Sequence, residues 1–222
     1  MSLTDQEIFW KSCQEGNLSK VIELSNKVDI NWRNPNHSSQ TGLYTSCDDG
    51  FTEIVKHLLS LPGIMVNKVE KERRTPLCLA AWNGIVDVVK ILLEDGRSDV
   101  NRFDQNGWTP LWAAGFWKEG ELVKILLKDG RVNVNQGDTE KRSPLWHACS
   151  EGNQEIVKLL LASGRGNDTA KLAEDTSDTD WTGTAPAEIA RKRGWDELGK
   201  LIDEYSANPI EIILSLRKEM GQ

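Results

Sequence analysis

Apolar residues recur along this chain in short stripes that have the spacing of a helix. In the clearest stretch, residues 86–93, they fall on one helical face at Val88, Val89, Leu92 and Leu93. A second apolar segment, residues 77–83, begins after Thr75-Pro76, and proline fits the first turn of a helix because its missing N–H has no partner there. Gly84 separates the two segments, where a chain reversal needs positive φ. The pattern predicts two short helices joined by a tight turn.

This helical pair is copied along the chain every 34 residues. Thr75-Pro76-Leu77 recurs as Thr109-Pro110-Leu111 and as Ser143-Pro144-Leu145, each followed by a stripe ending in Leu-Leu. A fixed period of this length indicates stacked supersecondary units, which form long binding surfaces more often than catalytic pockets. Aligning the copies predicts six units. The equivalent positions at which they align are Glu7, Thr41, Thr75, Thr109, Ser143 and Ala185.

The register also predicts the domain boundaries. We expect one repeat domain over residues 1–208, with units at about 3–32, 33–67, 68–101, 102–135, 136–169 and 179–208. The last interval is longer than the others, and the polar stretch 163–180 that lengthens it is expected to be a surface loop. Thr4 and Glu7 form a capping-box pattern at the first helix.

The remaining residues, 209–222, predict a short amphipathic helix over Pro209–Glu219. Its apolar positions have helical spacing: Ile210, Ile213, Leu216 and Met220. Because an uncapped stack exposes its core, we expect this helix to close the apolar end of the stack. A dimerisation or partner-docking helix is the alternative.

The repeated pattern resembles the ankyrin repeat. It contains Thr-Pro-Leu-x-x-Ala, a Gly four residues later, then Val-x-x-Leu-Leu, Gly and Val-Asn, and it covers about residues 3–208. The resemblance implies an all-α solenoid of stacked antiparallel helix pairs with projecting hairpin loops. It also implies protein–protein recognition without catalysis. Departures such as Gly42 in place of Pro, and Lys118 in place of the inter-helix Gly, put the local turn geometry in question but not the fold.

Composition narrows the class of partner. The chain of 222 residues has a net charge of −7, which argues against nucleic acid and against anionic lipid, because both attract basic proteins. No apolar run is long enough to span a bilayer, and the polar, acidic first residues are not expected to be a secretory signal.

The cysteines read as core residues. Cys13, Cys47 and Cys149 share one phase of the repeat with Ala81 and Gly115, so this position favours a small side chain. Neither these three nor Cys78 has the spacing of a metal-binding pair, and we expect a reducing compartment, the cytosol or nucleus.

The sequence contains no pattern that indicates catalysis or a cofactor. His57 and His147 occupy apolar phases and are expected to be packed helix residues, whereas His37 has no evident partner. Phosphate-binding and zinc-binding motifs are absent, so we expect no enzyme activity, no cofactor and no metal.

The nine tryptophans are the unusual feature of the composition. Trp10, Trp112 and Trp146 share a phase at the start of the first helix, where packing between units is expected to bury them. Another set lies at the end of the first helix or on the loop before it: Trp82, Asn83, Trp108, Phe116 and Trp117. By the resemblance, these positions line the concave groove. Such exposed aromatics favour a binding hot spot, although packing on one another and on the loops is the alternative.

Charged residues flank these aromatics at matching phases. Asp48 and Asp49 lie on one side and Glu151 on the other, while Arg74 and Arg142 share the loop phase of Trp108. The mixed signs indicate a specific partner segment. The basic run at 191–193 continues the groove phases, or simply suits the end of a helix.

One asparagine in each of four units follows Ile or Val: Asn31, Asn67, Asn101 and Asn135. By the resemblance, this Asn shapes the hairpin through side-chain to backbone hydrogen bonds. It is also a hydroxylation target in some members, and Asn101 fits that pattern best.

We therefore expect a non-enzymatic module that holds a partner protein in the concave groove and is monomeric by itself. A structural spacer without a dedicated ligand is one alternative. A regulator that occludes a partner enzyme or transcription factor is the other.

Overall fold

The computed structural model describes residues 3–166 and 184–221. Those residues form 13 helices, and their only β-type pairing is an isolated bridge between Asn34 and Gln40. The chain divides into two compact units, unit 1 (Met1–Gln105) and unit 2 (Asn106–Gln222).

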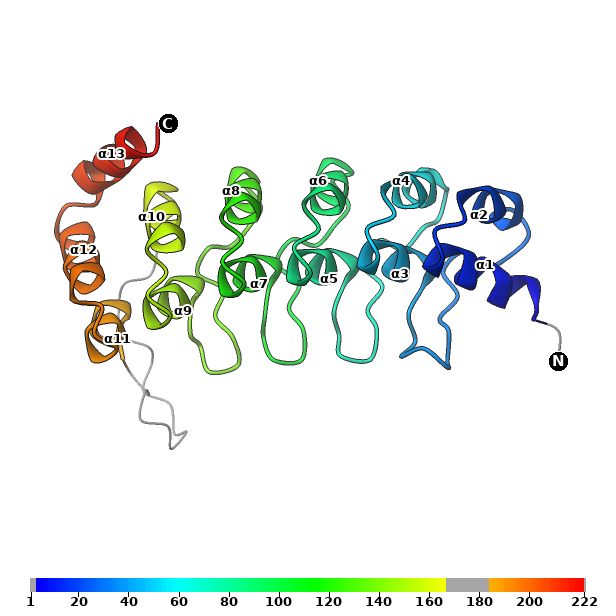
Figure 1. The fold of residues 1–222 in the computed structure, drawn as a ribbon, viewed down its shortest axis with the longest axis horizontal. Coiled ribbons are helices and arrows are strands. Elements are labelled where there is room, and N and C mark those ends of the chain that lie inside the picture. Colours follow the sequence, from blue (N-terminus) through cyan, green and yellow to red (C-terminus); the bar gives the residue numbers. More distant parts are fainter. Residues whose placement is uncertain (1–2, 167–183, 222) are drawn as a thin grey trace. The chain divides into compact units, whose positions relative to one another are not determined.

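Unit 1 contains three helix pairs. They are α1 (Asp5–Gln14) with α2 (Leu18–Leu24), α3 (Gly42–Asp48) with α4 (Thr52–Ser60), and α5 (Pro76–Trp82) with α6 (Val86–Glu94). In Figure 1 the first helices of the pairs form one row, the second helices form another, and the loops between pairs project away from both. Contacts run along both rows, α1 to α3 to α5 and α2 to α4 to α6.

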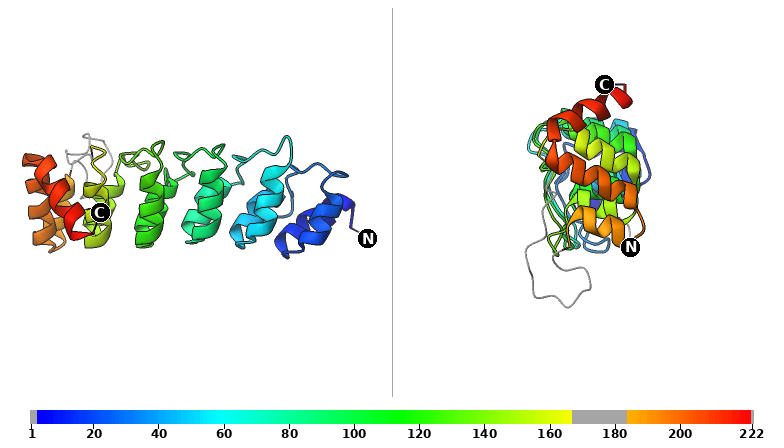
Figure 2. Two further views of the ribbon diagram at one scale, coloured as in Figure 1. Left: turned by 90° about the horizontal axis from the view of Figure 1, so that it is seen from above. Right: turned by 90° about the vertical axis from the view of Figure 1, so that its left-hand side faces the viewer.

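Unit 2 repeats this arrangement and adds a terminal helix. Its pairs are α7 (Pro110–Phe116) with α8 (Gly120–Lys128), α9 (Pro144–Ser150) with α10 (Gln154–Ala162), and α11 (Pro186–Lys192) with α12 (Asp196–Ala207), followed by α13 (Pro209–Glu219). Figure 2 shows the same layering of helices within each unit from two further directions. The predicted loop at 163–180 lies mostly outside the described residues.

The Thr-Pro or Ser-Pro pair sets where a first helix begins. The N-cap hydroxyl accepts a hydrogen bond from the backbone N–H three residues later, at 3.2 Å from Cys78 to Thr75, 3.1 Å from Trp112 to Thr109 and 3.2 Å from Trp146 to Ser143. Proline at the next position has no N–H that would be left unsatisfied there. The same geometry therefore starts α5, α7 and α9.

A residue with positive φ ends most of the first helices. Gly84 and Gly152 have φ of 69° and 65°, but Lys118 holds the same position after α7 with φ of 62°. The lysine side chain makes this conformation costly, because a Cβ crowds the following carbonyl in the left-handed region.

Replacing Lys118 with glycine is expected to raise the free energy of unfolding by about 1 kcal/mol, since strain relief outweighs the extra chain entropy. Chemical denaturation measures the change. Lys118→Ala is the matched control: it removes the charge but keeps the Cβ, so it should bring no comparable gain. Equal stability of the Gly and Ala variants would contradict a backbone origin.

Within each unit the core lies between the two helix rows and consists mainly of Leu, Val and Ala side chains from both rows. All four cysteines are buried and free, as the repeat phase predicts for Cys13, Cys47 and Cys149. Burial raises the pKa of the Cys13 and Cys149 thiols to about 12, so both are protonated at neutral pH. Trp10 and Trp146 are each only 3% exposed, as predicted.

The terminal helix α13 spans Pro209–Glu219, the same residues that the sequence predicted. It packs against α10 and α12. Arg217 donates from Nε to the carbonyl of Ala162 at 2.8 Å, and Ile213 lies over Gly164. Ile210 was predicted to share the packing stripe, but it is 75% exposed. The reason is geometric: the contact with the end of α10 is made from Ile213 onward, one turn into the helix.

Three of the repeated asparagines, Asn31, Asn67 and Asn135, connect a helix pair to the next loop. Asn31 donates from Nδ2 to the carbonyl of Gly63 at 2.9 Å and accepts from the N–H of Met65 at 2.8 Å. Asn67 binds the next loop in the same two ways, and Asn135 donates to the carbonyl of Gly166. The resemblance predicted side-chain to backbone hydrogen bonds at this asparagine, and the bonds of Asn31, Asn67 and Asn135 are of this kind. They join loops about one repeat apart.

Candidate functional site

Four aromatic side chains from α7 and the loop before it form one cluster in unit 2. Trp108, Trp112 and Phe116 stack nearly parallel, with ring centroids 4.4 Å and then 5.0 Å apart. Trp112 and Phe116 share one face of α7 because they are four residues apart, and Trp108 joins them from the loop. Trp117 meets Phe116 edge to face at 5.2 Å. We call these four residues the aromatic cluster.

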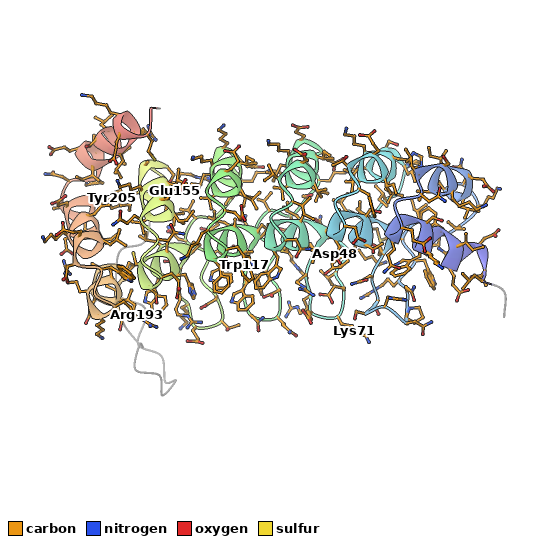
Figure 3. The ribbon with its side chains drawn as sticks, viewed as in Figure 1. Asp48, Lys71, Trp117, Glu155, Arg193 and Tyr205 are labelled. Carbon is orange, nitrogen blue, oxygen red and sulfur yellow. The ribbon has the colours of Figure 1, made fainter. Side chains whose placement is uncertain are left out.

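The cluster is buried at its base and exposed at its rim. Trp112 is 3% exposed, whereas Phe116 and Trp117 are 39% and 50% exposed. Figure 3 shows Trp117 at the end of α7, beside rings that gather below this helix. Large aromatic surface held in a fixed position and open to solvent is the property of a binding anchor.

His147 of α9 supports the buried base of the cluster. Its ring lies edge-on to Trp112, with centroids 4.9 Å apart. Its Nε2 lies 2.9 Å from Asp138 Oδ2 and must be the donor, because a carboxylate only accepts. The sequence predicted a packed helix residue at this position, and the structure adds the buried carboxylate that orients the ring.

Asp138 is the anchor of the hairpin loop that precedes α9. Its side chain is fully buried and accepts hydrogen bonds from the N–H groups of Glu140 and Arg142 at 2.9 and 3.0 Å and from Arg142 Nε at 2.8 Å. Burial alone would raise the pKa of Asp138, but the hydrogen bonds from His147 and Arg142 lower it to about 2. The carboxylate therefore stays ionised and ties hairpin, α9 and cluster together.

The loop residue before Trp108 also depends on this hairpin. Gly107 has φ of 82°, and a Cβ there would lie 2.5 Å from the backbone nitrogen of Thr139. Only glycine allows so close an approach in this conformation, so the contact fixes the direction in which Trp108 leaves the loop.

Arg142 was predicted to contact a partner, and in the structure its charge is matched within its own loop. It pairs with Asp138 and with Glu140 and lies over the ring of Trp146 at 5.4 Å. In unit 1, Arg74 pairs in the same way with Glu70 and Glu72. Both arginines are partly exposed, so they stiffen the loops and border the surface at once.

The other predicted site residues of unit 1 form a separate group. Asn83 donates from Nδ2 to Asp48 Oδ1 at 2.7 Å, which joins the ends of α5 and α3. Asp49 is exposed and Trp82 is partly buried at the end of α5. Unit 2 contains Trp108, Phe116, Trp117, Arg142 and Glu151, and Glu151 lies exposed at the end of α9.

Sequence reasoning missed the buried acids of the hairpins. Glu70, Asp104 and Asp138 recur at the same phase of the repeat, and all three are 6% exposed or less. This recurrence was a usable signal. His37, for which the sequence offered no partner, lies against Trp10 with ring centroids 4.4 Å apart and the rings tilted by 33°.

Among the described residues, no group of three or more His, Cys, Asp or Glu side chains is arranged to hold a metal ion. Residues 3–166 and 184–221 also include no helix with the length and apolarity needed to cross a membrane.

Comparison with known families agrees with the architecture. The family model described as ankyrin repeats (3 copies) matches residues 9–104 and 96–171. The chain therefore belongs to the ankyrin repeat family. Members of this family are generally protein–protein interaction modules and are typically not enzymes. A search of curated proteins returned no match to the chain.

Proposed function

We propose that this protein binds a partner protein in the concave groove that the ankyrin resemblance implies, with the aromatic cluster as anchor. The observation that supports this most is the pair of exposed rings on a buried base: Phe116 stacks on Trp112 and Trp117 packs against Phe116. Trp112 in turn contacts His147, which Asp138 orients. A preorganised aromatic patch loses little conformational entropy on binding, so more of its burial appears as affinity.

The same proposal includes the domain organisation. We infer six repeats over residues 1–208 and a terminal helix over 209–222, and we regard the protein as monomeric by itself. Four buried, protonated thiols suit a reducing compartment, the cytosol or nucleus. The acidic net charge favours a protein partner over nucleic acid.

Capture from the native cell tests the proposal. Tagged wild-type protein is compared with a Phe116→Ala/Trp117→Ala double variant. A stoichiometric partner that the wild type retains and the double variant loses supports the cluster as the site. The control is Ile210→Ala/Leu214→Ala, which removes side chains that are 75% and 62% exposed on α13. Equal recovery of the partner by all three proteins would reject the site.

The outcome also separates the alternatives. A spacer without a dedicated ligand predicts that no protein depends on the cluster for capture. A regulator that acts by occlusion predicts a captured enzyme or transcription factor whose activity falls in the complex.

A further inference from the structure

Three side chains of unit 2 occupy the same backbone position in three successive first helices. Trp117 is the C-cap of α7, Glu151 of α9 and Arg193 of α11. Their φ angles are −80°, −85° and −91°, and their ψ angles are 3°, −1° and 0°. Each backbone N–H donates to the carbonyl four residues earlier, at 3.1, 3.0 and 3.1 Å. Because the backbone geometry is the same, the Cα–Cβ bond of each residue leaves the end of its own helix in the same way. We call these three residues the C-cap row.

The three side chains of the C-cap row are exposed, and each has a different chemical character. Trp117 is 50% exposed, and Glu151 and Arg193 are also exposed. Glu151 takes part in none of the ion pairs found among the described residues. Figure 3 labels Trp117 and Arg193 at the first helices α7 and α11 of this unit. Along the row, a ligand would meet an aromatic ring, then a negative charge, then a positive charge.

The spacing of the row restricts the shape of the ligand. α7 packs against α9, and α9 against α11, and packed helices lie about 8–10 Å apart. A polyproline II segment turns once in three residues with a rise of about 3.1 Å each, so every third side chain points the same way at intervals of about 9 Å. A β-strand does not fit this spacing, because its side chains alternate and every third one faces the opposite side.

We propose that the C-cap row recognises a polyproline II segment of the partner whose residues i, i+3 and i+6 are apolar, basic and acidic. The apolar side chain packs on Trp117, the basic one pairs with Glu151 and the acidic one with Arg193. This inference rests on the proposed function, because it uses the same surface, and it specifies the chemistry of the partner.

Two peptides with blocked termini test this order of apolar, basic and acidic side chains. The matched peptide is Leu-Pro-Pro-Lys-Pro-Pro-Asp, and the exchanged peptide has Lys and Asp interchanged. Both are also made in reversed order, because the row fixes the order of side chains but not the direction of the backbone. Titrations of the wild type at millimolar peptide, followed through the tryptophan indole NMR signals, give each dissociation constant.

In at least one direction the matched peptide is expected to bind about fivefold tighter than the exchanged one, and added salt should reduce this preference. A Glu151→Lys/Arg193→Glu variant, verified as folded by circular dichroism, should reverse the preference. The two single variants, which should abolish it, serve if the double variant does not fold.

The remaining outcomes distinguish the two proposals. Binding that is lost in Phe116→Ala/Trp117→Ala but shows no charge preference would overturn the register and leave the aromatic anchor standing. If neither peptide binds in either direction, a segment of this kind is not the ligand. Partner capture from cells then still decides on the proposed function independently.

Discussion

Replacing Asp138 with alanine is expected to lower the free energy of unfolding by about 3 kcal/mol, the lower end of the cost of breaking a buried ion pair. The side chain is fully buried, and its loss removes acceptors from two backbone N–H groups, from Arg142 and from His147. The cost stays at the lower end because Arg142 is 23% exposed and keeps Glu140 as a partner. Urea denaturation measures the change.

Lowering the pH tests whether the stability that Asp138 contributes depends on its negative charge. The pKa of Asp138 is about 2 in the folded protein, against an ordinary value of 3.8, so folding favours the ionised form by about 2 kcal/mol. That contribution is fully present above about pH 4 and is lost as the pH falls toward 2. The stability difference between wild type and Asp138→Ala should shrink over this range.

Glu140→Ala is the matched control for the Asp138 variant. Glu140 pairs with the same arginine, but it is 42% exposed, so its loss should cost less than about 1 kcal/mol. An Asp138→Ala penalty that is small, or that stays constant from pH 7 to pH 2, would contradict the role of Asp138 as an ionised anchor.

The largest expected effect on binding comes from the rim of the aromatic cluster. With the captured partner purified, Phe116→Ala/Trp117→Ala should raise the dissociation constant at least about 30-fold, or about 2 kcal/mol. Both rings are partly exposed in the free protein and would become buried against a partner. Titration calorimetry measures the affinity of wild type and variant.

Two controls separate lost contact from lost structure. The double variant should still unfold cooperatively, because Trp112 and the core beneath it remain. The Ile210→Ala/Leu214→Ala variant should bind like the wild type, although Ile210 and Leu214 are exposed to a larger fraction than Phe116 and Trp117. An unchanged dissociation constant for the cluster variant would discard the site.

The fold could be predicted from the sequence because the same unit is repeated. Thr75-Pro76 and its copies, the apolar stripe of 86–93 and Gly84 each predict a local structure that depends on a few neighbouring residues. α1 begins after the predicted N-cap Thr4, and α13 spans Pro209–Glu219 as expected. The exposure of Ile210 was not predictable, because it depends on where α13 meets α10.

The candidate site could be predicted from the sequence only in part. Phase counting predicted that Trp112 would be buried and that Phe116 and Trp117 would be exposed, because phase decides which way a helical residue faces. It could not pair His147 with Asp138, since their contact depends on how the hairpin folds back over α9. The same limit hid the loop partners of Arg142 and Arg74.

The sequence by itself determined the all-helical repeat, the helix starts and the exposure of Phe116 and Trp117, because these follow from periodicity and local capping. Only the tertiary structure decided which groups meet across a loop and a helix: Asp138 with His147, and His147 with Trp112. It also showed that Trp117, Glu151 and Arg193 leave their helices with one backbone geometry. Such contacts depend on distances and directions in three dimensions, and a one-dimensional pattern does not specify them.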